Sequence, residues 1–294
     1  MTDNLTHSGD TAKSVKNDLK NTQLAFIGCG VMAESMIAGL LRKNLVKPKQ
    51  IIASHPRASR REELKAKYDI RIFENNTTAV KNTYESDDSI IALCVKPQRL
   101  PGVLKELKGV VLSNQLVLSI IAGARIEAIS EELGNRKIVR AMPNTPSQIG
   151  HGITAWTSTE EISDAERAEV KALLTALGRE LYVETENMID MATSLSATGP
   201  TYIFLVMEAL TDAGVHMGFS REMAKELVQE TMLGSVLFAI ESHKHPAELR
   251  NMVTSPGGTS AEAIYQMEKG SLRTVLSKAV YAAYNRAVAL GQKK

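Results

Sequence analysis

The sequence is short of cysteine, of net charge and of long apolar runs. Its two cysteines, Cys29 and Cys94, lie far apart and form no C-x-x-C pair, so both are expected to pack as small buried side chains in a reducing compartment. The formal net charge is only +2, and no dense lysine or arginine stripe occurs, which argues against nucleic acid as a partner. No apolar run approaches the length that spans a bilayer, which argues against a membrane-embedded protein.

Metal-binding and targeting signals are absent as well. His243 and His245 are two positions apart and would not share one helix face, so no metal site is expected there. Residues 1–20 are polar, carry Asp3, Asp10 and Asp18 and contain no apolar h-region, unlike a signal or transit peptide. We therefore predict a disordered tail over residues 1–20 and a cytoplasmic location.

A glycine-rich turn follows the first buried strand. Leu24–Ile27 is uniformly apolar, and residues 28–33 then read Gly-Cys-Gly-Val-Met-Ala, the G-x-G-x-x-A spacing, ahead of a helical pattern. Strand, tight turn and helix together form the context that the dinucleotide fingerprint requires. Gly28 can take backbone angles closed to other residues, Gly30 lets a pyrophosphate approach, and Ala33 lets helix and strand pack closely. A tight strand–helix turn without a ligand is the alternative interpretation.

Strand and helix patterns alternate through the first two thirds of the chain. Apolar strands are predicted at residues 50–53, 70–73, 89–95, 116–121, 138–139 and 152–156, with an edge strand at 179–183. This alternation predicts an α/β fold with a Rossmann-type, doubly wound parallel sheet. Ser163 and Glu166 have capping-box spacing at the start of a helix that follows the 152–156 strand.

Beyond residue 188 only helical patterns remain, and they carry broad apolar faces. We predict a dinucleotide-binding Rossmann domain over residues 21–187 and an all-helical dimerisation and substrate domain over residues 188–294. Helices of this kind more often pack against a second copy than stand alone, so a homodimer is expected.

The end of the second strand favours one dinucleotide. A carboxylate normally holds the ribose 2′-hydroxyl of NAD at this point. Residues 53–61 contain no acid but include Arg57 and hydroxyl side chains, and a guanidinium suits a 2′-phosphate. The pattern favours NADPH, with NADH as the second choice; a solvated basic loop is the alternative.

A second glycine motif lies in the helical half, at residues 253–262. Gly257 and Gly258 precede Thr259 and Glu262, which have capping-box spacing. Free N–H groups at such a helix start can gather around an anion such as a carboxylate. A plain connection between two helices is the alternative.

Taken in order, the motifs resemble the pyrroline-5-carboxylate reductase family. They are the Gly28 turn, Val95-Lys96-Pro97, Met142-Pro143-Asn144-Thr145-Pro146, Thr198-Gly199-Pro200, and His245-Pro246 followed by Val253-Thr254-Ser255-Pro256-Gly257-Gly258-Thr259. The likeness covers residues 24–290, and the Ser-Pro-Gly-Gly run after His-Pro is its specific part.

The resemblance implies an enzyme that reduces 1-pyrroline-5-carboxylate to L-proline with NAD(P)H, the last step of proline biosynthesis. It also implies an interleaved homodimer, assembled into decamers in several members. The positions implied to line the cofactor are Gly28, Cys29, Gly30, Val31, Met32, Ala33, His55, Arg57, Asn76, Cys94, Val95, Lys96, Pro97, Ile121 and Ala122. Those implied to meet the substrate are Glu186, Ser255, Gly258, Thr259 and Ser260, and Ser260 is the candidate catalytic residue, placed to donate to the ring nitrogen.

Two departures from the family pattern leave other functions open. Ser260 stands where the family usually has threonine, and Ala197-Thr198 replace the usual Gly-Ser before Gly199-Pro200. A non-catalytic dinucleotide-binding relative is therefore one alternative. A β-hydroxyacid dehydrogenase is another, although it needs an early helical lysine, and none occurs between Pro200 and Lys225.

Overall fold

The computed structural model describes residues 18–86 and 88–292. Most of the predicted tail, residues 1–17, lies outside the described residues. The chain is already packed at Leu19, which is fully buried.

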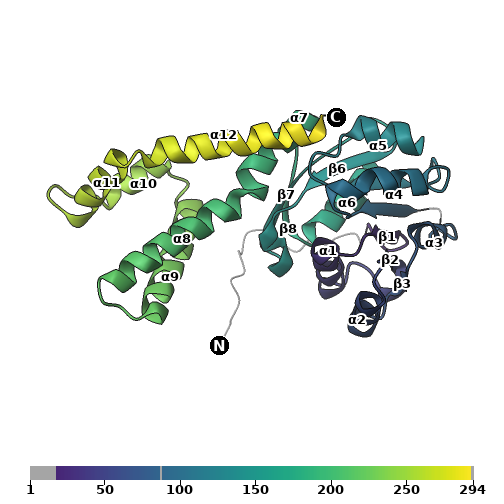
Figure 1. Ribbon diagram of the computed structural model, residues 1–294, viewed down its shortest axis with the longest axis horizontal. Helices are drawn as coiled ribbons and strands as arrows, with labels where there is room; N and C mark the ends of the chain where they lie inside the picture. The colour runs from purple at the N-terminus through teal and green to yellow at the C-terminus, as the bar shows by residue number, and fades with distance from the viewer. Residues whose placement is uncertain (1–17, 87, 293–294) are drawn as a thin grey trace.

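The first part of the chain forms a sheet with helices on both faces (Figure 1). Its elements, in chain order, are β1 (Gln23–Ile27), α1 (Val31–Arg42), β2 (Ile51–Ser54), α2 (Ala58–Tyr68), β3 (Arg71–Phe73), α3 (Asn76–Lys81), β4 (Ser89–Leu93), α4 (Leu100–Leu107), β5 (Leu116–Ser119), α5 (Ile126–Leu133), β6 (Ile138–Met142), β7 (Gly152–Ser158), α6 (Asp164–Thr175) and β8 (Gly178–Tyr182). Short 3₁₀ turns at Pro48–Gln50, Pro97–Arg99 and Thr145–Ile149 join some of them.

The sheet has the order β3-β2-β1-β4-β5-β6-β7-β8. The first six strands are parallel, as predicted, and the order reverses between β1 and β4. The parallel prediction is wrong at one place, because β7 pairs with β6 antiparallel. A parallel return needs a long crossover, and only a short segment containing a 3₁₀ turn separates β6 from β7. β8 then pairs with β7 in parallel.

Two apolar cores lie on the two faces of the sheet. Successive residues of β1 alternate between them, since Leu24 and Phe26 pack with α1, α2 and α6, whereas Ala25 and Ile27 pack with α3, α4 and α5. Buried on both faces, the strands are apolar along nearly their whole length.

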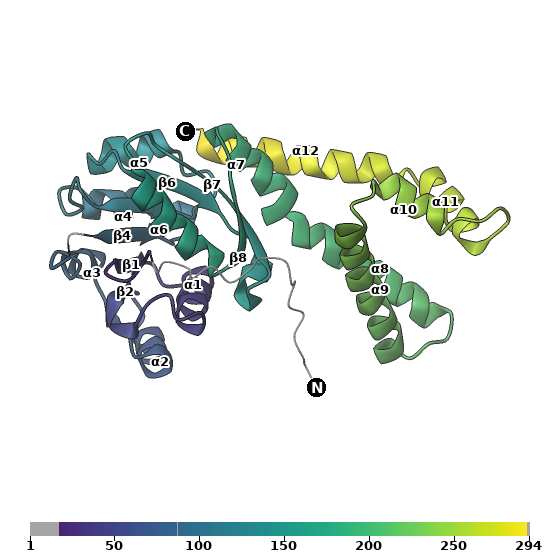
Figure 2. The same ribbon diagram turned by 180° about the vertical axis from the view of Figure 1, so that it is seen from behind.

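The remaining elements form a long helical arm that points away from the sheet (Figures 1 and 2). They are α7 (Glu186–Ala192), a π-helical turn (Thr193–Ala197), α8 (Gly199–His216), α9 (Arg221–Ser242), α10 (Pro246–Met252), α11 (Thr259–Lys269) and α12 (Leu272–Gly291). α12 runs back along the arm, and its last turn reaches the sheet. Among the described residues, no helix is long and apolar enough to cross a membrane.

The helical arm has almost no interior of its own. Among the described residues, Ala224 and Ala287 are the only buried hydrophobic side chains beyond Ile189. The arm instead carries 24 of the 31 large hydrophobic side chains that are exposed in the described chain. A monomer rarely exposes that much apolar surface, so these faces require a covering surface, and a second copy of the arm offers one of matching character.

We therefore expect a dimer that persists on dilution. Because unfolding of a dimer releases two chains, its midpoint temperature should rise with protein concentration. Light scattering at decreasing concentration and thermal unfolding at several concentrations measure both properties. A stable, active monomer at low concentration would contradict the expectation.

Candidate functional site

The carboxyl ends of β1, β2 and β4 meet at the Gly28 turn. Gly28 has φ +85°, and an added Cβ would lie 2.4 Å from the Cγ1 of Val95, so only glycine fits there. Its N–H donates to Ser54 Oγ at 3.2 Å, and the N–H of Cys94 donates to the Ile27 carbonyl at 2.9 Å. The structure thus brings together three of the segments that the sequence assigns to the cofactor.

The N-terminus of α1 opens directly from this turn. The N–H of Glu34 donates to the Gly30 carbonyl, so the amides of Val31, Met32 and Ala33 come before the first hydrogen bond within the helix. A Cβ added to Gly30 would meet no described atom within 4 Å, and Val31 is 62% exposed. Open space therefore lies in front of free amides and a positive dipole end, as a pyrophosphate requires.

A carboxylate near this helix start is neutralised by its neighbours. Burial opposes ionisation of Glu34, but hydrogen bonds from Lys67, Arg60 and Tyr68 outweigh it and lower the pKa of Glu34 to about 2. Lys67 Nζ and Tyr68 Oη both donate to Glu34 Oε1 at 2.8 Å. The negative charge of Glu34 is therefore compensated before any phosphate approaches.

Three arginines follow the end of β2, and they differ in whether their guanidinium groups already have partners. Arg60 is paired with Glu34 and Glu63, while Arg61 donates to the carbonyls of His55 and Pro56. The Arg57 guanidinium is exposed and has no polar partner among the residues that the structure describes. Arg57 is thus the cation left available at the position where the sequence predicts a 2′-phosphate contact.

His55 and Asn76 lie beside this end of β2. His55 Nδ1 accepts from the Arg57 N–H at 3.2 Å, and burial together with the Arg57 charge lowers the pKa of His55, which keeps the ring neutral near pH 7. Ser54 Oγ donates to Asn76 Oδ1 at 2.8 Å. Sequence reasoning missed Ser54, whose position at the end of a buried strand was the available signal.

The two thiols are packing groups at the same edge. Burial raises the pKa of Cys29 to about 12 and raises that of Cys94 as well, with Cys29 nearby. Cys29 is buried, as predicted, and Cys94 is half-buried. Both thiols therefore stay protonated and unreactive.

The other predicted cofactor residues lie in loops at this edge. Lys96 is exposed and precedes the 3₁₀ turn at Pro97. Ile121 and Ala122 follow β5, the neighbour of β4, and Ile121 is buried. Both loops leave carboxyl ends of parallel strands, where doubly wound folds bind ligands.

The predicted substrate loop, residues 255–260, lies between α10 and α11 at the far end of the helical arm (Figures 1 and 2). We call the edge of the sheet formed by the carboxyl ends of the parallel strands, where the predicted cofactor residues lie, the cofactor edge. Within one chain the substrate loop is not brought to this edge. Gly257 has φ +69°, and Gly258 packs so close to Ser255 that an added Cβ would lie 2.6 Å from Ser255 Oγ.

The predicted Thr259–Glu262 capping box is wrong. The helix cap is Gly258, in an extended conformation, and α11 begins at Thr259. Ala261 and Glu262 donate their N–H groups to the Gly258 carbonyl, so the amides of Thr259 and Ser260 precede the first helical hydrogen bond. Glycine takes the cap position without a side chain, and Glu262 instead accepts from Gln266.

Glu186 lies at the start of α7, where the sheet and the arm join. Its Oε1 accepts from Arg140 at 2.8 Å and from the Ile126 N–H at 2.9 Å. Arg140 is 1% exposed and also donates to Asp190 at 2.7 Å. The carboxylate of Glu186 is thus engaged by Arg140 and by the Ile126 N–H, and its contact with substrate stays a prediction. Sequence reasoning missed Arg140 and Asp190, although an arginine inside an apolar strand was a signal.

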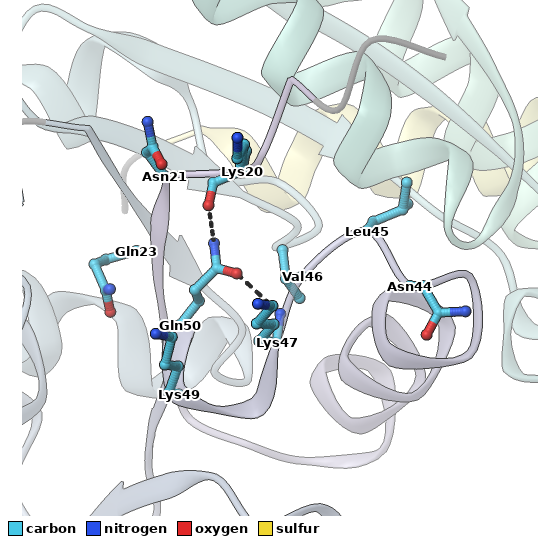
Figure 3. Close-up of a pocket in the computed structure, with 9 residues that line it drawn as sticks. All are labelled: Lys20, Asn21, Gln23, Asn44, Leu45, Val46, Lys47, Lys49 and Gln50. Atoms are coloured by element: carbon cyan, nitrogen blue, oxygen red, sulfur yellow. Dashed lines mark hydrogen bonds between the residues drawn. The ribbon is translucent and has the colours of Figure 1, made fainter. Parts of the chain in front are cut away.

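A cavity also lies beside the amino ends of β1 and β2, at the edge of the sheet opposite the Gly28 turn (Figure 3). It measures about 650 Å³ and is lined by Lys20, Asn21, Gln23, Asn44, Leu45, Val46, Lys47, Lys49 and Gln50. The Gln50 amide donates to the carbonyls of Leu19, Lys20 and Thr22 and accepts from the Lys47 N–H. These hydrogen bonds hold the loop before β2 against the segment before β1. No predicted site residue lines the cavity.

Comparison with known families finds two matches that divide the chain. The family described as "Pyrroline-5-carboxylate reductase dimerisation" matches residues 186–290. The family described as "NADP oxidoreductase coenzyme F420-dependent" matches residues 23–123. The first covers the helical arm and the second covers the strands of the cofactor edge.

Similar proteins match over nearly the whole chain. A pyrroline-5-carboxylate reductase of Synechocystis sp. is 38% identical over 92% of this chain and 99% of its own length, and one of Pseudomonas aeruginosa is 37% identical over 94% and 99%. Among solved structures, that of a pyrroline-5-carboxylate reductase from Coxiella burnetii has a TM-score of 0.83 at 34% identity, over 93% of this chain and 100% of its own. A pyrroline carboxylate reductase from Plasmodium falciparum, solved with NADP bound, has a TM-score of 0.83 at 31% identity, over 92% and 99%.

Arg57→Ala tests the predicted phosphate contact. A charged hydrogen bond to phosphate is worth about 1.5–3 kcal/mol, so the ratio of kcat/KM for NADPH to that for NADH should fall about tenfold or more. Lys65→Ala, which removes an exposed cation from the same helix, should leave the ratio unchanged. An unchanged ratio in Arg57→Ala would place the 2′-phosphate elsewhere.

Proposed function

The chain belongs to the pyrroline-5-carboxylate reductase family, and from this premise we propose how its residues carry out the reaction. The enzyme reduces 1-pyrroline-5-carboxylate to L-proline with NAD(P)H, the last step of proline biosynthesis. The question for this chain is which residues bind the cofactor, hold the imine acid and align the two.

The cofactor edge fits a dinucleotide. The unfilled space over Gly30 and the free amides of Val31, Met32 and Ala33 suit the pyrophosphate, and Arg57 suits the 2′-phosphate of NADP. We propose that His55, Asn76, residues 94–97, Ile121 and Ala122 complete the cofactor site. Bound NADPH supplies the hydride for the C=N bond, and every other requirement falls to the protein.

One observation supports a site shared by two chains: the Ser255–Ser260 loop lies at the far end of the arm from its own cofactor edge. We propose that the loop of the partner chain closes the site, because the arms carry the apolar surface that a dimer would bury. The family match to a dimerisation region over the arm is consistent with this arrangement.

The loop offers donors suited to a carboxylate. Its free amides at Thr259 and Ser260, together with the positive dipole end of α11, favour an anion. Ser255 and Gly258 shape the turn that presents them. We propose that these groups hold the substrate carboxylate while the Ser260 hydroxyl donates to the ring nitrogen.

The chemistry then depends mainly on alignment. A protonated imine is already electrophilic at carbon, so hydride transfer needs correct distance and exclusion of water more than a general acid. The ring nitrogen gains a lone pair as the hydride arrives at carbon, and the Ser260 hydroxyl donates to that developing lone pair. We assign no acid or base residue on the chain.

We propose a homodimer as the basic unit, with a decamer as the larger assembly that the family resemblance implies. The domain division at residues 21–187 and 188–294 is proposed on the change from sheet to arm. A cytoplasmic location is proposed on the two unpaired thiols, Cys29 and Cys94.

Turnover of the purified protein tests the function. With 1-pyrroline-5-carboxylate and NADPH, we expect oxidation of NADPH matched by formation of proline. A β-hydroxy acid with NADP⁺ should give no reduction of the cofactor. Reaction of the hydroxy acid would support a β-hydroxyacid dehydrogenase, and dinucleotide binding without either reaction would support a non-catalytic relative.

Ser260→Ala tests the catalytic assignment. Loss of one hydrogen bond to a developing charge should lower kcat and kcat/KM together, by about ten- to a hundredfold. Ser260→Thr keeps the hydroxyl and restricts its rotamers, so it should retain most activity.

Ser220→Ala is the matched control, because Ser220 caps α9 and accepts from the Met223 N–H. It should lower stability by ~1 kcal/mol and leave the kinetics intact. If Ser260→Ala behaves in the same way, Ser260 only supports its helix.

A further inference from the structure

A group of four charges, two of them buried, lies at the junction between the sheet and the helical arm. Arg140, in β6, is 1% exposed and pairs with Glu186 and Asp190 of α7. Arg125, between β5 and α5, lies 2.9 Å from Asp190 Oδ2 and 3.9 Å from Glu186 Oε2. Glu186 and Asp190 are one helical turn apart, so one face of α7 contacts both β6 and the loop between β5 and α5.

The last turn of α12 packs against the loop between β5 and α5, the loop that carries Arg125. Gly123 has φ +74°, and an added Cβ would lie 2.7 Å from the Cβ of Leu290 and 2.8 Å from its carbonyl carbon. A Cβ added to Gly291 would lie 2.8 Å from Arg125 Nε. The loop after β5 and the last turn of α12 are therefore in direct contact, with no room for a further carbon between them.

α12 connects this contact to the substrate loop. It contains 20 residues, which corresponds to about 30 Å at 1.5 Å per residue. α11, whose first turn holds the free amides of Thr259 and Ser260, directly precedes it. The C-terminal end of α12 therefore contacts the cofactor edge. Its N-terminal end adjoins α11, which follows the predicted substrate loop.

We propose that Arg125, Arg140, Glu186 and Asp190, together with the Gly123–Leu290 contact, form a joint that positions the cofactor edge relative to the arms. In a symmetric dimer the two arms pair, so the angle at each joint sets where the partner's Ser255–Ser260 loop meets this chain's cofactor edge. These are positioning residues for hydride transfer, and the proposal rests on the proposed function.

Stability alone does not account for the joint. Buried ion pairs can often be replaced by apolar residues of similar size without loss of stability. Arg140 Nε has no hydrogen-bond partner among the described residues, which is a further cost of burying it. What the arrangement provides is a fixed direction, because the Arg140 guanidinium meets Glu186 and Asp190 through its two terminal nitrogens.

The joint also reaches the loop after β5, whose residues Ile121 and Ala122 are proposed to contact the cofactor. Gly123 directly follows Ala122, and the Ile126 N–H donates to Glu186. A shift of α7 or α12 is therefore passed to the residues beside the hydride donor. A misplacement of about 1 Å can cost about a hundredfold in rate.

Gly123→Ala is the most direct test, and Gly134→Ala is its matched control. Both glycines have positive φ, +74° and +66°, but a Cβ at Gly134 meets nothing within 4 Å. Both variants strain the backbone, and only Gly123→Ala displaces α12. We expect kcat to fall about ten- to a hundredfold in Gly123→Ala, with KM for NADPH within about twofold of wild type. Gly134→Ala should keep the wild-type kcat.

Arg125→Met tests the charges at the more exposed side of the joint, since Arg125 is 28% exposed and Arg140 still pairs with Asp190. It should lower kcat in the same way, and Arg125→Lys should recover part of the loss. With NADPH deuterated at the transferred position, the isotope effect on kcat should rise in both Gly123→Ala and Arg125→Met, because hydride transfer becomes rate-limiting. Light scattering should show that each variant remains a dimer.

The possible results separate the two proposals. If wild type does not reduce the imine, the proposed function fails and the positioning proposal falls with it. If wild type is active and Gly123→Ala and Arg125→Met lose only thermal stability, with unchanged kcat and isotope effect, the positioning proposal alone is wrong. Equal loss of kcat in Gly134→Ala and Gly123→Ala would also overturn it.

Discussion

The helical arm cannot bury its own apolar surface, and this constraint governs the rest of the molecule. The sheet half has two complete cores, one on each face. Beyond α7, the described part of the arm has two buried alanines and a long series of exposed leucines, valines, methionines and phenylalanines. Apolar burial is the main driving force of folding and association, so the arm is stable only when another surface covers it. We propose that pairing with a second copy satisfies that need and brings the loop of each chain to the cofactor edge of the other.

A shared site needs a fixed relation between sheet and arm, and the structure has rigid contacts where the two meet. Arg140 is enclosed between β6 and α7 with its charge matched by Glu186 and Asp190. On the other side of the junction, Gly123 allows the last turn of α12 to touch the loop after β5. The Gly28 turn, with its free helix amides and the exposed Arg57, is where we propose that the cofactor binds. In this account the Gly28 turn binds the cofactor, and the junction at Arg140 and Gly123 aligns the cofactor edge with the arm.

The sequence predicts what is decided locally. The Ser163–Glu166 capping box forms in both directions, because a cap acts within a few residues. The direction of β7 was missed because it depends on the length of the preceding connection. The predicted Thr259 cap is wrong because Gly258 takes the cap position. The pairing of Arg140 with Asp190 joins residues 50 positions apart, and nothing local specifies such a contact.

The central claim is that each active site combines the cofactor edge of one chain with the loop of the other, and mixed dimers test it most directly. Gly30→Asp should fold, since space lies over Gly30, but its carboxylate would exclude the phosphates; Ser260→Ala disables the loop. Coexpressed with two different tags and purified through both, these two variants form dimers with one chain of each kind. If sites are shared, one of the two sites regains both intact parts, and the mixed dimer should show about half of the wild-type activity. If each chain builds its own site, the mixed dimer should be no more active than the two parent variants.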